Sequence, residues 1–190
     1  MIIAVKEKDR VVVAISVLRD EDILTAKDAT DIENLPIKFA EDGKLIAFGK
    51  AGRIADLFLY DEYFLKAEKT PFNMIKNVIP GMMKVMKDNK IDTSDNTYFD
   101  NTLIICDNEH LYSVYPDKSF FELDDYCSDP CEDDFIRSVM DATVGQPAEE
   151  RIEKTISFLK KMNLTNAYPY VVVDTKDKQF KCVFESEGEK

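Results

Sequence analysis

The chain opens on two runs of β-branched residues with a short charged segment between them. Residues 2–5 and 11–17 are rich in valine and isoleucine, and residues 7–10 read Glu-Lys-Asp-Arg. Runs of this composition favour β-strands, and a short polar separator between two of them is typical of a tight hairpin. Strands joined by a short turn pair antiparallel. The beginning of the chain therefore predicts an antiparallel sheet.

Further strands and two helix pairs are expected along the chain. Period-two and β-branched patterns predict strands at 36–40, 44–49, 102–106, 111–115, 119–123, 170–174 and 179–184. Apolar residues at helical spacing predict helices at 52–68, 70–86, 132–143 and 147–162. We expect a kink at Pro80-Gly81, because a proline inside a helix removes a backbone donor and clashes with the preceding turn. Residues 18–35 are expected as loop and short strand, and the acidic segment 124–134 as a solvated loop.

This order of elements favours one fold class. Consecutive strands form antiparallel sheets, and each helix pair has one apolar side to cover. Two stacked antiparallel sheets with a helix pair on each outer surface satisfy these demands, so we expect an α+β protein, a four-layer αββα sandwich. A ferredoxin-like or other α+β arrangement also fits this order of strands and helices. No Pro/Gly/Ser-rich linker divides the 190 residues, so we expect a single domain over 1–184 and a polar tail over 185–190.

Net charge and hydropathy exclude some classes of function. The chain has 25 basic and 37 acidic residues, a formal net charge of −12, which repels polyphosphates and anionic lipids. We therefore expect binding neither to nucleic acid nor to membranes. No stretch approaches the ~20 apolar residues of a membrane-spanning helix, and the beginning of the chain lacks the pattern of a signal peptide. These features predict a cytoplasmic protein without a disulfide framework.

The cysteines and the single histidine are weak candidates for metal-binding or catalytic residues. Cys127 and Cys131 lie amid acidic residues, but their spacing is not that of a zinc pair and a second ligand pair is missing, so a solvated loop is favoured over a metal site. His110 follows a turn sequence, where an exposed turn residue is the ordinary interpretation. Phosphate-binding loops and the common hydrolase motifs are absent from the sequence. We expect neither a metal nor a cofactor.

Several stretches resemble the N-terminal-nucleophile (Ntn) hydrolases of the proteasome β-subunit type. The segment 5–14, Val-Lys-Glu-Lys-Asp-Arg-Val-Val-Val-Ala, is similar to the first hairpin of that family. Residues 48–57 look like the strand end that begins its first helix, 145–152 resemble the Pro-Glu-Glu start of its fourth helix, and 168–174 are similar to its closing hairpin. The resemblance implies the αββα fold, assembly into rings, and a threonine nucleophile whose own α-amino group accepts the proton.

The residues that correspond to the family's catalytic set differ in type. On this resemblance Met1 lies one residue past the threonine, Ser16 replaces an aspartate, and Asn34 or its neighbour Leu35 replaces a lysine. Asn163 corresponds to a later aspartate, and Ser128 to a serine before the third helix. Neutral side chains in place of a lysine do not lower the proton affinity of a nucleophile. Because Ile2 is bulky, we expect Met1 to remain on the chain.

The sequence thus favours a non-catalytic proteasome-like protein that acts through self-assembly or partner binding. The alternative is an Ntn hydrolase of the threonine-peptidase type whose nucleophile this alignment does not recognise. A second alternative is an unrelated α+β binding domain, which would have one sheet instead of two.

Overall fold

A computed structural model describes residues 1–16, 37–39, 45–48, 73, 76–77, 79–88, 103–115, 119–129, 133–164, 169–177 and 180–183. Three predicted segments lie entirely outside these residues: the helix 52–68, the segment 18–35 and the polar tail 185–190. The strands in the described part are β1 (Ile2–Lys6), β2 (Val11–Ser16), β3 (Ile37–Phe39), β4 (Leu45–Phe48), β5 (Leu103–Cys106), β6 (Leu111–Val114), β7 (Phe120–Glu122), β8 (Tyr126–Asp129), β9 (Tyr170–Asp174) and β10 (Phe180–Val183). The helices are α4 (Ile79–Asp88), α5 (Asp133–Ala142) and α6 (Ala148–Lys161).

The strands form two antiparallel sheets of five. The first sheet has the order β10-β9-β2-β1-β8, and the second has the order β3-β4-β5-β6-β7. Every strand pair in the described part of the chain is antiparallel, including the opening hairpin, in which Ile2 faces Ile15. The sequence prediction of an antiparallel α+β protein is therefore confirmed, and the alternative with a single sheet is wrong.

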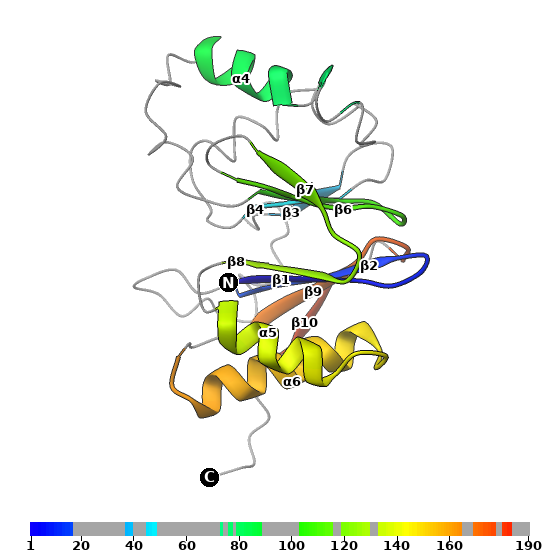
Figure 1. Cartoon of the computed structure of the whole chain (residues 1–190), viewed down its shortest axis with the longest axis vertical. Helices are drawn as coiled ribbons and strands as arrows, with labels where there is room; N and C mark the ends of the chain where they lie inside the picture. The colour runs from blue at the N-terminus through cyan, green and yellow to red at the C-terminus, as the bar shows by residue number, and fades with distance from the viewer. Residues whose placement is uncertain are drawn as a thin grey trace.

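The two sheets stack face to face, as Figure 1 shows. One apolar cluster lies between them and takes Ile2, Ala4 and Val13 from the first sheet, and Ile104 and Leu111 from the second. The side chains between these positions, Ile3, Val5 and Val12, belong to a second cluster with α5 and α6. The opening strands are apolar at almost every position because both of their faces are covered.

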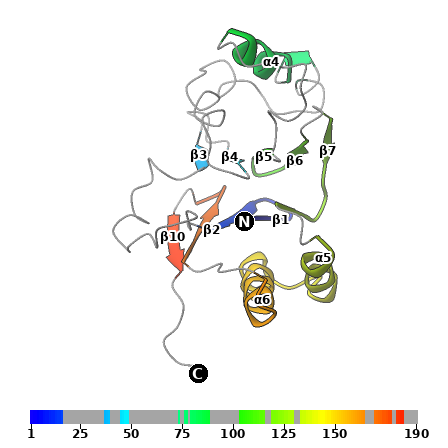
Figure 2. The ribbon, with the colours of Figure 1, turned by 90° about the vertical axis from the view of Figure 1, so that its left-hand side faces the viewer.

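Helices α5 and α6 cover the outer face of the first sheet. Their apolar stripe supplies Ile136, Met140, Ile152, Ile156 and Leu159 to the cluster beneath them. Figure 2 shows the two helices end-on, side by side below the sheet. On the opposite side of the molecule, α4 lies beyond the second sheet. None of the described helices has the length and apolar character that crossing a membrane requires.

Strand β8 corrects the sequence prediction for the acidic segment. Residues 124–134 were expected to be a solvated loop, yet Tyr126–Asp129 pair with β1 along the edge of the first sheet. The chain passes from β7 in the second sheet directly to β8 in the first, which joins the two sheets at one side (Figure 1). The sequence prediction missed this strand because acidic residues flank its short Tyr-Cys-Ser centre and hide the apolar pattern that is typical of a strand.

The helix predicted at 70–86 is irregular near its proline. Lys76 and Asn77 have π-helical geometry, and the regular helix α4 begins at Ile79, directly before Pro80. A proline ring clashes with the carbonyl four residues earlier, which is that of Lys76, and a π-helical turn relieves this clash. The change of helix type thus lies just before Pro80, whereas Pro80 and Gly81 themselves belong to the first turn of α4; the predicted kink at Pro80-Gly81 stays a prediction.

Candidate functional site

The beginning of β1 is where the resemblance places the catalytic centre. Strand β1 lies between β2 and β8, with Ile2 paired to Ile15 on one side and to Asp129 on the other. Continuing the first register by one residue sets Met1 opposite Ser16, the last residue of β2. Ser128 pairs with Ile3 on the other side. Three of the five predicted site residues, Met1, Ser16 and Ser128, therefore gather at one end of the first sheet.

The side chain of Met1 lies on the helix side of the sheet. It is half-buried and packs against the apolar cluster that contains Ile3 and the inner face of α5 and α6. Successive side chains of a strand point to opposite faces. The Met1 side chain therefore lies on the opposite face of the sheet from the side chains of Ile2 and Ala4, which lie between the two sheets.

Of the two other predicted site residues, the structure describes Asn163 but not Asn34. Asn163 is exposed just beyond the end of α6, with a φ of 54° and its N–H donating to the carbonyl of Lys160 at 2.9 Å. Asparagine tolerates this left-handed conformation better than most residues, so the turn that ends α6 accounts for its presence there.

At the other end of β1, a charged cluster fixes the turn. The guanidinium of Arg10 donates to Glu7 at 2.6 Å, to Asp174 at 2.7 Å and to Glu149 at 2.8 Å and 3.0 Å. Glu7 in turn accepts the N–H of Ala148 at 2.7 Å. We call Glu7, Arg10, Glu149 and Asp174 the Arg10 cluster. It ties the first hairpin to the start of α6 and to the end of β9.

Within the Arg10 cluster, hydrogen bonding favours the charged forms of Glu7 and Arg10. The hydrogen bond from Arg10 holds the pKa of Glu7 below its ordinary value of 4.5, although partial burial opposes this. The same hydrogen bond, with those to Glu149 and Asp174, raises the pKa of Arg10. Sequence reasoning missed the cluster. The spacing of Glu7 and Arg10 was visible, but Glu149 and Asp174 lie more than a hundred residues away.

A second arginine anchors the chain between β7 and β8. Arg151, in α6, is buried and donates to Asp125 at 2.9 Å and to the carbonyl of Met140 at 3.1 Å. The backbone carbonyl of Asp125 accepts the N–H of Lys6 at 2.6 Å. Asp125, one of the acidic residues expected in a solvated loop, thus links β1 to α6.

Of the metal and histidine candidates, the structure describes Cys127 and His110. Cys127 is buried in the cluster between the sheets, whereas Cys131 lies outside the described residues. Within the described parts of the chain, no three His, Cys, Asp or Glu side chains gather closely enough to hold a metal ion. His110 does follow a turn, but it is partly buried: its Nδ1 lies 3.0 Å from Asp107 Oδ1, and its ring stacks on Tyr112 at 5.9 Å.

Comparison with solved structures assigns this arrangement to a known fold. BPH from Thiobacillus denitrificans has a TM-score of 0.68 and 14% identity over 92% of this chain and 97% of that chain. Its complex with epoxomicin has a TM-score of 0.67 and 14% identity over 91% and 96%. This chain has the proteasome β-subunit-like fold. It is the fold that the sequence resemblance predicted, in a diverged form.

Two further proteasome-like structures agree. Anbu, described as an ancestral beta-subunit, from Yersinia bercovieri has a TM-score of 0.66 and 13% identity over 98% of this chain and 88% of that chain. HslV from Trypanosoma brucei has a TM-score of 0.57 and 17% identity over 91% and 97%. No protein-family model and no curated protein matches the sequence. The match covers nearly the whole chain at low identity, so it shows the proteasome-like fold.

Proposed function

We propose that this chain is a non-catalytic protein with the proteasome-like fold that acts through self-assembly or by holding a partner protein. The observation that carries the proposal is the environment of Met1. A nucleophile must be exposed to its substrate, whereas the Met1 side chain is an unreactive thioether packed against the cluster under α5 and α6. The resemblance also puts Ser16 in the place of an aspartate, which leaves a neutral residue at the end of β2.

The experiment that tests this proposal examines the chain end and its reactivity together. Intact mass and N-terminal sequencing of the purified protein are expected to give a chain that begins at Met1. Incubation with epoxomicin is expected to leave the mass unchanged, and fluorogenic peptides are expected to remain uncleaved. BPH from Thiobacillus denitrificans is the positive control, since a structure of its epoxomicin complex exists. A new Thr, Ser or Cys terminus together with an epoxomicin adduct would refute the proposal.

A hydrolase with a different nucleophile is the second candidate. It is favoured by the gathering of two hydroxyl residues, Ser16 and Ser128, beside the beginning of β1. The two candidates are separated by Ser16→Ala and Ser128→Ala, measured with the same peptide substrates. A cleavage activity that either substitution abolishes would support the hydrolase, provided that the variant keeps the thermal unfolding midpoint of the parent protein.

We also infer that the molecule is a four-layer αββα sandwich that works in a reducing compartment such as the cytoplasm. The position of α4 beyond the second sheet supports the fourth layer (Figure 2). Among the described residues, Cys106, Cys127 and Cys182 form no disulfide bond with one another, which suits a reducing compartment. A crystal structure tests whether the fourth layer exists: a second helix, formed by residues 52–68, is expected beside α4.

A further inference from the structure

Strand β7 is an edge strand of the second sheet. It pairs with β6 on one side and ends the strand order β3-β4-β5-β6-β7. Figure 2 shows it at the margin of that sheet, running toward the first sheet. The backbone groups on the far side of an edge strand have no neighbouring strand, so they are able to pair with another extended chain.

The register of β6 and β7 identifies these backbone groups. The N–H of Leu123 donates to the carbonyl of Leu111 at 2.8 Å, on the side of the chain that faces β6. Alternate residues of an antiparallel strand turn their backbone groups to the same side, so the N–H and C=O of Phe120 and Glu122 point away from β6. These groups make no backbone hydrogen bond to another residue in the part of the chain that the structure describes.

An exposed aromatic pair lies beside this edge. Phe121 is 57% exposed and Tyr115 is 42% exposed, and their rings meet edge to face at 5.7 Å. Ser113, the direct partner of Phe121 in β6, is only 1% exposed, although both lie on the face that is turned toward the first sheet. The cover over this face therefore ends between β6 and β7. Exposed aromatic groups of this kind are typical of protein interaction surfaces.

Acidic groups lie along the same edge. Glu122 is exposed at the end of β7. The side chain of Asp124, two residues further on, is fully exposed, and its ion pair with Lys6 is 3.7 Å long. Strand β7 carries no basic residue, so pairing with a second copy of this edge would gather acidic groups alone. Opposite charges on facing strands attract and like charges repel, so the edge favours a partner strand with basic side chains.

We propose that the edge of β7 accepts an extended segment of a partner protein as a further, antiparallel strand of the second sheet. The partner residues opposite Phe120 and Glu122 exchange backbone hydrogen bonds with them. The partner residue between these two lies beside Phe121, where an apolar side chain covers the exposed ring. A lysine or arginine opposite Glu122 supplies the complementary charge. The preferred segment therefore alternates apolar and basic residues.

This docking surface deepens the proposed function by naming the place and the chemistry of partner binding, and it rests on that function only in requiring that the chain holds a partner protein. The probe is the peptide Val-Lys-Val-Lys-Val, with a fluorescent label at its beginning and an amide at its end. We expect its fluorescence anisotropy to rise with protein concentration and to saturate. The acidic peptide Val-Glu-Val-Glu-Val, labelled in the same way, is expected to remain unbound.

Methylation of the peptide backbone separates strand addition from a contact between side chains alone. Methyl groups on the backbone nitrogens of the two lysines remove the N–H groups that face β7, and we expect them to weaken binding roughly 10-fold or more. A methyl group on the nitrogen of the central valine is the matched control. That nitrogen points away from β7 in the proposed register, so binding is expected to be retained. Equal effects of the two modifications would overturn the proposed pairing.

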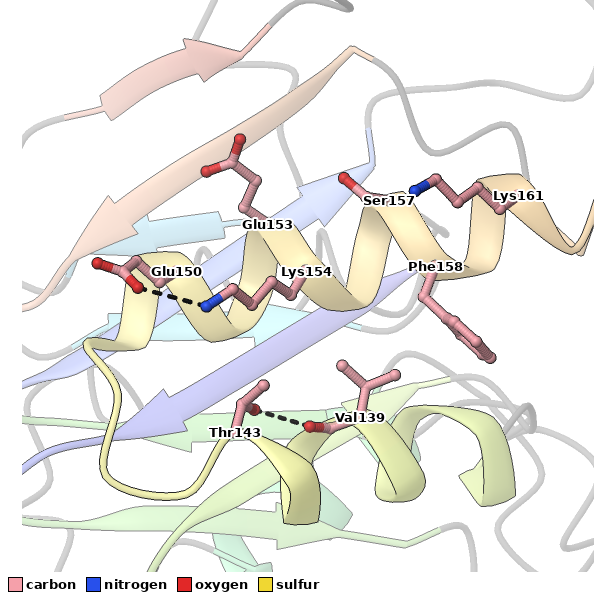
Figure 3. A pocket seen from close by; sticks show the side chains of 8 residues that line it. All are labelled: Val139, Thr143, Glu150, Glu153, Lys154, Ser157, Phe158 and Lys161. Carbon is pink, nitrogen blue, oxygen red and sulfur yellow. Dashed lines mark hydrogen bonds and ion pairs between the residues drawn. The ribbon is translucent and has the colours of Figure 1, made fainter.

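Charge reversal tests the acidic part of the surface. We expect Glu122→Lys to bind the basic peptide roughly 5-fold more weakly or worse at low salt and to bind the acidic peptide instead. Glu153→Lys changes the net charge equally and is the matched control. Glu153 is exposed on α6, where it lines a groove of about 640 Å³ on the outer surface of the helix pair (Figure 3). We expect this variant to bind both peptides as wild type does, and unchanged binding by Glu122→Lys would contradict the charge pairing.

The aromatic part is tested by Phe121→Thr, which removes the ring but keeps a residue that suits a strand. We expect the basic peptide to bind this variant roughly 5-fold more weakly, at an unchanged thermal midpoint. A fall in oligomer mass with unchanged peptide binding would make this edge a contact between copies and overturn the proposal. Wild-type protein that leaves the basic peptide unbound would overturn the docking surface alone. Cleavage of the peptide, seen by mass spectrometry, would instead refute the non-catalytic function.

Discussion

The two ends of strand β1 are held by different forces. At its beginning, Ile3 is completely buried and Met1 packs on the same apolar cluster beneath α5 and α6. At its end, the turn to β2 is fixed by the Arg10 cluster, in which one guanidinium contacts three carboxylates. Apolar packing holds the end where the resemblance puts catalysis, and ion pairs hold the end where it puts none.

This difference shows that β1 is held in place by packing and ion pairs that need no catalytic group. Apolar burial depends little on salt, whereas partly exposed ion pairs weaken as salt screens them. Salt and pH therefore act on the Arg10 cluster and leave the beginning of β1 unchanged.

The largest effect is expected from Ile3→Ala. The substitution removes a fully buried side chain next to Met1 and leaves a cavity under the helices, so we expect the free energy of unfolding to fall by about 3 kcal/mol. Urea denaturation at low and high salt measures it, and the loss is expected to be the same in both. A loss that depends strongly on salt would contradict the apolar account of this end.

A smaller effect, of about 2 kcal/mol, is expected from Arg10→Ala, because three carboxylates then lie close together without their shared partner. Arg10→Lys is the matched variant. It keeps the charge, but an ammonium lacks the planar fork that contacts several carboxylates at once, so it is expected to recover only part of the loss. Urea denaturation in rising salt is the measurement, and the deficit of Arg10→Ala is expected to shrink. Equal stability of Arg10→Ala and wild type would contradict the structural role of the cluster.

The smallest effect is the contribution of Glu7 to acid sensitivity. Its folded-state pKa is lowered from 4.5, so its stabilising contribution is complete above about pH 4.5 and is lost as the pH falls through the lowered value. Glu7→Gln removes this titration. Thermal midpoints measured between pH 3 and pH 7, roughly the range in which carboxyl groups titrate, are expected to fall less steeply in Glu7→Gln than in wild type. Parallel profiles would show that Glu7 does not contribute.

Much of the fold was predictable because local patterns agreed with the tertiary structure. Residues 2–5 and 11–17 were predicted as a hairpin and correspond to β1 and β2, and the helices predicted at 132–143 and 147–162 correspond to α5 and α6. Strand β8 was missed, because its assignment depends on pairing with β1 and on burial of Cys127, neither of which is a property of residues 126–129 alone.

The candidate site was predicted in part. The resemblance selected Met1, Ser16 and Ser128, and the sheet places all three at one end of β1. The Arg10 cluster was not predicted, because it joins residues from distant parts of the chain.

Local patterns were enough to predict the strands and helices over most of the described residues, because apolar periodicity and turn residues are local properties. The fold was predicted from the order of these elements and from the family resemblance. The tertiary structure decided which faces are buried, that Met1 lies on the helix side of the sheet, and which charges find partners. These features depend on contacts between residues far apart in the chain. No local pattern encodes such contacts, since each requires the packed position of both partners.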